Sequence, residues 1–362
     1  MLGQRTGVGR YLLNVLRHWT PEVLAGRAEV CVYLPRPHGL SQISLPENLR
    51  VKVLRPEARM LVWENLRVGP AVRDDLVFYP SYSRPIITHG RTVVTTHDAL
   101  SALHPELFPT ADRLFYNHLY GWSARHATLV LTTSQASMQD IARCWNVPLD
   151  RIRVVYLAPA ECFQRCNDLS LAALTRERYF GEPCPFFLFV GKMSGRRNIS
   201  TLLEAFAHFK KRTSAPHRLV LVGLNPHRLR VREQGVELGI SEALIICGYV
   251  PDQELNLLYN AAEALVIPSV YETASLPAME AQAVGTPVVC IATAGMREIT
   301  GGEAAMVPEL RADLLADAMA EVAESKSLRE RLVEGGLRHS ARFSWRKTAR
   351  ETFEVLWEAA RL

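Results

Sequence analysis

The chain has 362 residues, 48% of them hydrophobic and 22% charged, with 42 Lys and Arg against 37 Asp and Glu. This length suggests about two domains, and the ordinary composition excludes a disordered chain, a disulfide-stapled miniprotein and a bundle of membrane helices. The net charge of +5 is too small over this length to indicate a nucleic-acid-binding protein.

The surplus of positive charge lies in the first half of the chain. Residues 1–160 hold 18 Lys and Arg and 12 Asp and Glu, a difference of +6, and the remaining 24 and 25 give −1. Two interpretations stay open, an anionic partner or membrane surface and ordinary scatter in surface charge. Seven cysteines without a C-x-x-C pair fit free thiols in a reducing cytosol. Because no apolar run reaches about 18 residues, we expect a cytoplasmic protein that does not span a membrane.

Short runs rich in β-branched residues alternate with longer amphipathic segments along the chain, as in β-α units around parallel sheets. Strands are predicted at 28–35, 49–55, 76–80, 92–96, 128–133, 152–157, 186–191, 218–223, 244–250, 264–268 and 287–292. Helices are predicted at 10–19, 311–324, 327–342 and 344–361. The predicted fold class is therefore α/β, with two doubly wound sheets.

The least periodic stretch lies between the two halves, in LAPAECFQRCNDLS (157–170) and in GEPCP (181–185), where Gly and Pro interrupt the pattern. We expect a first domain over 1–160, a hinge region over 161–184, a second domain over 185–343 and a terminal helix over 344–362.

The segment YETASLPAMEAQAVGTPVV (271–289) follows a predicted buried strand. Its Glu272 and Glu280 are eight positions apart, with a helix start predicted at Ser275. Amide groups at a helix start favour an anion such as a diphosphate. A carboxylate on each side of that anion could bind hydroxyls of two sugars. The alternative is an ordinary capped helix with two solvated glutamates.

The segment FFLFVGKMSGRRNISTLLEAF (186–206) combines a predicted strand with a glycine turn that carries Lys192, Arg196 and Arg197. Cations at the carboxyl end of a parallel strand lie where doubly wound sheets bind ligands. They could neutralise a pyrophosphate without a metal ion. A solvated basic loop is the alternative.

Two further segments belong to the first half. RTVVTTHDALSALHPELFP (91–109) places His97 at the end of a predicted strand, where it either contacts a substrate hydroxyl or caps a turn. TGVGRY (6–11) brings Gly7 and Gly9 to a helix start, where a ligand can approach the backbone. Almost nothing precedes this turn, so the first strand is either missing from this chain or a very short one within residues 1–6.

Taken together, the segments resemble the retaining glycosyltransferases of group 1, called family 4, over nearly the whole chain. The motifs that carry the resemblance are, in chain order, Gly7–Tyr11 (GVGRY), Trp63–Asn65 (WEN), Thr96–Asp98 (THD), Leu131–Ser134, Arg151–Val155 (RIRVV), Val190–Asn198, Gly248–Tyr259, Pro268–Ala281, Gly285–Val289 and Phe343–Trp345 (FSW). The resemblance implies two Rossmann-like domains facing a cleft, the GT-B fold, with the terminal helix crossing back to the first domain.

The resemblance also implies roles for residues. Glu280 would hold the nucleotide ribose, Glu272 would contact hydroxyls of the transferred sugar, and Lys192 and Arg197 would neutralise the diphosphate. The family's usual order of Arg before Lys is reversed here. His97 would lie near the transferred sugar. The other donor-binding positions implied are Gly7, Gly9, Gly191, Arg196, Thr273, Ala274, Ser275 and Leu276.

One departure concerns the loop that follows Glu272. Many relatives have Glu-Gly-Phe-Gly-Leu-Pro, whereas this chain has Glu-Thr-Ala-Ser-Leu-Pro at 272–277. Both glycines are absent, which restricts φ and adds side chains beside the expected phosphates. The choice of donor is therefore open.

The function implied is transfer of a hexose, with mannose favoured, from a nucleotide diphosphate sugar to a hydroxyl of a glycan or lipid-linked saccharide, with retention, in polysaccharide or lipopolysaccharide synthesis. We expect no metal ion and no further cofactor, and peripheral association with the inner face of the membrane. Two alternatives of the same architecture stay open, a noncatalytic nucleotide-sugar-binding protein and a nucleotide-sugar epimerase. A dehydrogenase is disfavoured because G-x-G-x-x-G is absent.

Overall fold

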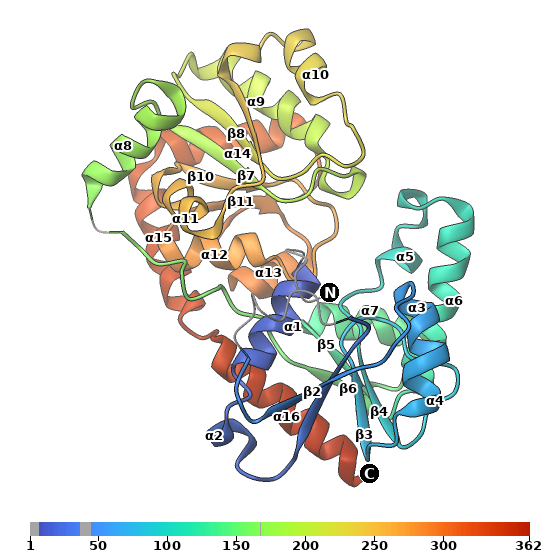
Figure 1. The fold of residues 1–362 in the computed structure, drawn as a ribbon. Coiled ribbons are helices and arrows are strands. Elements are labelled where there is room, and N and C mark those ends of the chain that lie inside the picture. The colour runs from blue at the N-terminus through green and yellow to red at the C-terminus, as the bar shows by residue number, and fades with distance from the viewer. Residues whose placement is uncertain (1–6, 37–44, 167) are drawn as a thin grey trace. The chain divides into compact units, whose positions relative to one another are not determined.

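A computed structural model describes residues 7–166 and 168–362 except for 37–44, and it divides into two compact units (Figure 1). The N-terminal unit comprises the described residues up to Leu157 together with Phe343–Leu362. The C-terminal unit is Ala158–Arg342.

The C-terminal unit is built on one parallel sheet of six strands in the order β12-β11-β10-β7-β8-β9. Its strands are β7 (Phe186–Val190), β8 (Arg218–Val222), β9 (Leu244–Gly248), β10 (Ala264–Ile267), β11 (Val288–Ile291) and β12 (Ala305–Val307). Because β7 pairs with both β8 and β10, the strand order reverses between β7 and β10. Ligands of doubly wound sheets bind at this switch point, outside the carboxyl ends of the strands.

Alternate residues of β7 pack on opposite faces of this sheet, as the two-residue period of a strand requires. Phe187 and Phe189 lie in the core beneath α9 (Ile199–Thr213) and α14 (Ala312–Glu324). Phe186 and Leu188 lie in the core beneath α11 and α12. The other helices of the unit are α8 (Leu169–Phe180), α10 (Val231–Glu237), α11 (Asp252–Ala261), α12 (Leu276–Val284), α13 (Ala294–Thr300) and α15 (Lys326–Ser340).

The stretch after Ala158 is bonded to α11. The amides of Gln164 and Cys166 donate to the side-chain oxygens of Asn256 and Asn260, at 3.1 and 2.7 Å. Phe163 is buried in the same core as Phe186. The chain therefore passes between units at Leu157–Ala158 and at Arg342–Phe343.

The N-terminal unit holds two parallel sheets, β3-β4-β5-β6 and the pair β1-β2. The strands are β1 (Val30–Leu34), β2 (Leu49–Val53), β3 (Leu76–Tyr79), β4 (Arg91–Thr95), β5 (Leu129–Thr132) and β6 (Ile152–Val154). Its first helices are α1 (Gly7–Arg17), α2 (Pro21–Leu24), α3 (Met60–Trp63), the π-helical segment η2 (Glu64–Val68) and α4 (Gly69–Ala71). They are followed by α5 (Leu100–Leu103), α6 (Thr110–His126) and α7 (Gln135–Trp145).

The first helix already includes Gly7, so it extends further toward the N-terminus than the start at Arg10 that the sequence predicts. Gly9 and Tyr11 are both buried in it, so the glycines belong to the first turns of an amphipathic helix and not to a turn before it. The very short first strand allowed by the sequence falls in residues 1–6, which lie outside the described residues.

The terminal helix α16 (Trp345–Arg361) packs against α1 and against β3, β4 and β5, which confirms that it crosses back to the first unit. Arg153 bonds both carboxylate oxygens of Glu358, at 3.0 and 2.5 Å. The indole of Trp19 donates to the carbonyl of Ala349 at 3.0 Å. The expected α/β fold with two Rossmann-like domains is thus confirmed.

Candidate active site

The central group of the C-terminal unit joins the loop after β7 to the loop after β10. The Arg196 Nη1 atom lies 2.6 Å from Oε1 of Glu272, and Nη1 of Arg197 lies 3.6 Å from the same oxygen. Arg196 also donates to the carbonyl of Tyr271 at 2.9 Å. Both loops lie at the switch point between β7 and β10, so the structure brings these three residues together where a ligand is expected. We call them the arginine–glutamate cluster.

This cluster is largely removed from water, because the side chain of Glu272 is only 6% exposed and that of Arg197 only 13%. Burial lowers the pKa of the Arg197 guanidinium. Burial alone would raise the pKa of the Glu272 carboxyl, but the charges of Arg197 and Arg196 outweigh it and hold that pKa below its ordinary value. Glu272 is therefore ionised near neutral pH, paired with two cations in a site where charges interact strongly.

Two glycines make room for this arrangement. A Cβ atom at Gly191, whose φ is +146°, would lie 2.7 Å from Nη1 of Arg197. A Cβ atom at Gly295, in α13, would lie 1.9 Å from the carbonyl oxygen of Glu272. Any side chain at either position would displace a member of the cluster.

Lys192 lies in the same loop and is exposed, with no ion pair recorded among the described residues. Lys192, Arg196 and Arg197 carry three positive charges against the one negative charge of Glu272, which leaves a net charge of +2. Arginine can bind a phosphate with two parallel hydrogen bonds, whereas lysine acts as a point charge. The loop after β7 can therefore neutralise most of the charge of a diphosphate.

The helix α12 begins where the sequence predicts. The Ser275 hydroxyl accepts from the amide of Ala278 at 3.4 Å, and Leu276 is the first helical residue. Thr273, Ser275 and Leu276 are buried and Ala274 is half-buried. The amides of this first turn give a positive helix end that favours an anion.

Glu280 lies one turn into α12 and is 2% exposed. The phenol of Tyr259, itself fully buried in α11, donates to Oε2 of Glu280 at 2.9 Å. The interpretation of two solvated glutamates is wrong for both Glu272 and Glu280. Sequence reasoning missed Tyr259, although it ends the GYVPDQELNLLY segment.

In the N-terminal unit, His97 lies two residues beyond the end of β4. Its ring meets those of Tyr11 and Tyr82 edge to face, with centroids 5.4 and 5.5 Å away, and its carbonyl accepts from the Ser137 hydroxyl at 2.8 Å. Burial lowers the pKa of His97 to about 4, so the imidazole is neutral at pH 7. A neutral imidazole can exchange hydrogen bonds with a sugar hydroxyl.

Gly7 lies in the first turn of α1, where a Cβ atom would meet nothing within 4 Å. The described residues therefore give no packing reason for a glycine at this position. The role of Gly7 and Gly9 in donor binding stays a prediction.

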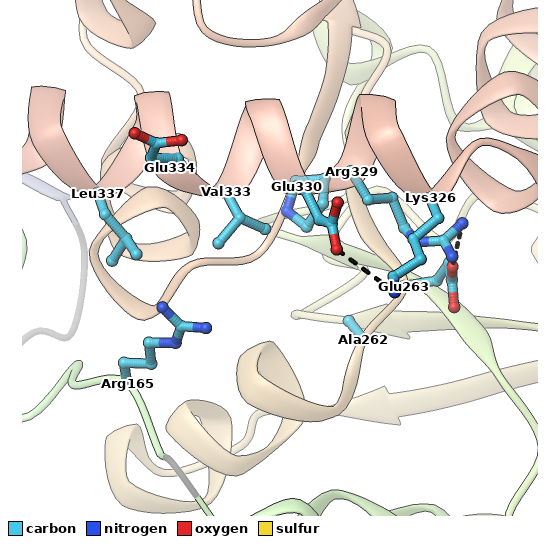
Figure 2. Close-up of a pocket in the computed structure, with 10 residues that line it drawn as sticks. Arg165, Ala262, Glu263, Lys326, Arg329, Glu330, Val333, Glu334 and Leu337 are labelled. Carbon is cyan, nitrogen blue, oxygen red and sulfur yellow. Dashed lines mark ion pairs between the residues drawn. The ribbon is translucent and has the colours of Figure 1, made fainter.

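The C-terminal unit also has a groove of about 570 Å³, whose lining includes no member of the arginine–glutamate cluster (Figure 2). It is lined by Ala262 and Pro287, which precede β10 and β11, so it is at the amino ends of the strands. Its charges pair with one another, Arg329 with Glu263 at 3.3 Å and Lys326 with Glu330 at 3.6 Å. Three basic side chains (Arg165, Lys326 and Arg329) face three acidic ones (Glu263, Glu330 and Glu334), so the groove carries no net positive charge to attract a diphosphate.

No group of three His, Cys, Asp or Glu side chains in the described parts of the chain could hold a metal ion. No described helix is long and apolar enough to cross a bilayer.

Comparison with solved structures identifies the fold. Anabaena HepE, solved in complex with UDP-glucose, shares the fold with a TM-score of 0.77 and 19% identity over 98% of this chain and 97% of that one. WaaG, a glycosyltransferase involved in lipopolysaccharide biosynthesis, shares it with a TM-score of 0.73 and 16% identity over 98% and 96%. The fold is therefore the GT-B fold of glycosyltransferases.

Comparison of sequences defines the family. The family described as "Glycosyl transferases group 1" matches residues 176–339. O-antigen chain mannosyltransferase B of Escherichia coli is 31% identical over 381 residues, which cover 97% of this chain and 95% of that one. The chain belongs to the group 1 glycosyltransferases, family 4, which are retaining enzymes.

Proposed function

We propose that this enzyme transfers a mannosyl residue from a nucleotide diphosphate sugar, with GDP-mannose as the candidate donor, to a hydroxyl of a glycan or lipid-linked saccharide in polysaccharide or lipopolysaccharide synthesis. The observation that carries the donor part is the arginine–glutamate cluster at the β7–β10 switch point. Support for mannose comes from the 31% identity with the Escherichia coli mannosyltransferase over nearly the whole chain.

The proposed roles follow from charge. Negative charge on the diphosphate grows as the bond to the sugar breaks, so Lys192, Arg196 and Arg197 stabilise the transition state more than the bound donor. Both ion pairs of Glu272 fall on Oε1, and Oε2, which takes part in neither, would accept from hydroxyls of the transferred sugar. We propose that Glu280, oriented by Tyr259, holds the ribose.

The remaining proposals concern the donor contacts of Gly7, Gly9, Gly191, Thr273, Ala274, Ser275 and Leu276, and the placement of His97 near the transferred sugar. We further propose that the reaction takes place in the cytoplasm, at the inner face of the membrane. The basic surplus of +6 in residues 1–160 supports this placement. Cosedimentation with vesicles of anionic and of neutral lipid tests it, since equal binding to both would contradict it.

The test of the donor uses the full chain with GDP-mannose and, separately, UDP-glucose, each with mannose-terminated oligosaccharides. We expect release of GDP and an α-linked mannosyl product, identified by NMR of the new anomeric proton. Turnover of UDP-glucose without turnover of GDP-mannose would contradict the proposed donor. Retention of the anomeric configuration is read from the same spectrum.

A further inference from the structure

A second polar cluster lies in the N-terminal unit. It consists of Glu64, the first residue of η2, with Tyr82 in the loop after β3 and Tyr116 and Tyr120 in α6. We call it the tyrosine–glutamate cluster. Its position beside His97, beyond the carboxyl end of β4, is where a parallel sheet binds ligands. The family resemblance assigns no role to any of its four residues.

The tyrosine rings form a continuous stack that begins at His97. The Tyr82 ring meets His97 at 5.5 Å and stacks on Tyr120 at 4.6 Å with an interplanar angle of 26°. The Tyr120 ring in turn stacks on Tyr116 at 5.2 Å and 21°. Each ring is therefore held by its neighbours, and the hydroxyl-bearing side chains lie next to one another in fixed positions.

Glu64 is linked to this stack through Ser83, the residue after Tyr82, and its charge acts on the Tyr120 phenol. Its carboxyl group is nearly buried, at 6% exposed. Its one hydrogen bond within the described structure is accepted from the Ser83 hydroxyl at 2.9 Å. A carboxylate can accept about four hydrogen bonds, so most of this capacity is unused. Burial raises the pKa of the Glu64 carboxyl to about 7, and the hydrogen bond from Ser83 offsets only part of this effect.

The acidic groups around the cluster disfavour an anionic ligand. Burial raises the pKa of the Tyr120 phenol, and the charges of Tyr116, Asp98 and Glu64 raise it further. Burial and the charge of Glu64 also raise the pKa of the Tyr79 phenol, and the charge of Arg84 lowers it. That arginine is already engaged, because it lies over the Trp122 ring and donates to the carbonyl of His126.

We propose that the tyrosine–glutamate cluster binds an uncharged sugar ring of the acceptor, with Glu64 accepting hydrogen bonds from its hydroxyls. A pyranose carries several hydroxyl donors on an apolar ring, so it fits a site that offers spare acceptor oxygens, phenol groups and aromatic surface together. A phosphorylated acceptor fits less well, because the negative charges of Glu64 and Asp98 both act on the Tyr120 phenol of the cluster. This inference rests on the proposed function for the identity of the reaction, but the binding it describes can be measured alone.

The test measures binding of methyl α-D-mannopyranoside to the full chain by saturation-transfer NMR. We expect Glu64→Gln and Tyr120→Phe to weaken binding about 10-fold, as for loss of hydrogen bonds to a charged group. Glu57→Gln and Tyr33→Phe, at an exposed ion pair and an exposed hydrogen bond of the same unit, are matched controls that should change nothing. Mannose 6-phosphate should bind more weakly than the methyl glycoside.

Absence of mannoside binding to the wild type, unchanged binding in both cluster variants, or tighter binding of mannose 6-phosphate would each overturn the inference. Melting temperatures confirm that the variants fold, and Glu64→Gln retains the oxygen that accepts from Ser83. In turnover assays, Glu64→Gln should raise the KM for the acceptor about 10-fold and leave GDP-mannose affinity within about twofold. If the wild type does not bind GDP-mannose, the donor proposal fails, while the mannoside titration still decides on the cluster.

Discussion

In the C-terminal unit, Glu272 lies beside two guanidinium groups that hold the pKa of its carboxyl below its ordinary value, whereas in the N-terminal unit Glu64 accepts a single hydrogen bond from a neutral serine and its pKa rises to about 7. Both carboxyls are 6% exposed, so burial alone does not separate them. The difference lies in the partners that the neighbouring loops supply.

The same contrast holds for the other polar groups of the two clusters. The loop after β7 supplies Lys192, Arg196 and Arg197, while the region after β3 and β4 supplies tyrosines and a neutral His97. A site rich in cations favours a diphosphate, and a site of phenol, imidazole and carboxyl groups favours sugar hydroxyls. The comparison suggests that the chain separates recognition of donor charge from recognition of acceptor hydroxyls.

The largest effect on activity is expected when the arginine–glutamate cluster loses Arg197. Arg197→Ala should lower kcat/KM for the donor about 100- to 1000-fold, by analogy with loss of a group that stabilises transition-state charge. Initial rates with GDP-mannose measure this. Arg212→Ala, which removes an exposed arginine paired with Asp317 in the same unit, is the control and should stay near wild type. A loss below about 10-fold in Arg197→Ala would contradict the assigned role.

A smaller effect is expected when the charge of the carboxylate is removed. Glu272→Gln should lower kcat about 10- to 100-fold and weaken donor affinity less, because a hydrogen bond to a charged group contributes about 1.5–3 kcal/mol. The variant also leaves Arg197 buried without its charge partner, so its melting temperature should fall. Steady-state kinetics, with melting curves as the check on folding, separate the two effects. A larger loss in affinity than in kcat would assign Glu272 to donor binding alone.

For the tyrosine–glutamate cluster, we expect the stability of the protein to depend on pH through Glu64. Because the pKa of Glu64 is raised in the folded state, its contribution to stability is greatest below about 4.5 and is lost as pH rises to about 7. The melting temperature of Glu64→Gln minus that of the wild type should therefore increase over this range, by about 2–4 °C for each kcal/mol. A difference that is constant with pH would place the Glu64 carboxyl in an ordinary solvated environment.

The smallest effect concerns His217, a histidine of the C-terminal unit outside both clusters. It stacks on Phe187 at 5.1 Å, and burial lowers its pKa to about 4, as for His97. Its stability contribution is present above about pH 6.5 and is lost as pH falls toward 4. His217→Phe should remove this loss and raise the melting temperature at pH 5 by about 2 °C, with unchanged turnover. Reduced turnover in His217→Phe would show that His217 also takes part in the reaction, so that a lowered pKa would not set His97 apart from it.

Much of the fold could be predicted from local pattern. All eleven predicted strands are present, since each is a β-branched or aromatic run bounded by turn residues, and Ser275 caps α12 as its side chain predicts. The strand Ala305–Val307 was missed because three residues are too few to show a period. The helix at Gly7 was predicted too late because two glycines argue locally against a helix, while burial of Tyr11 favours it.

The candidate site was predictable only in part. Lys192, Arg196, Arg197, Glu272 and Glu280 could be selected from the motifs, but the pairing of Arg196 with Glu272 joins residues 76 positions apart and depends on the order of β7 and β10. Glu64 could not be selected by its charge alone. Its neighbours Trp63 and Val68 are buried, and only the folded chain shows that the carboxyl is buried with them.

The central claim is that the arginine–glutamate cluster holds the diphosphate of the donor. Calorimetric titrations of wild type and Arg197→Ala with GDP and guanosine, and with UDP and uridine, test it most directly. We expect Arg197→Ala to weaken binding of a diphosphate at least about 10-fold and to leave binding of the matching nucleoside unchanged. Equal losses for the diphosphate and its nucleoside would contradict it.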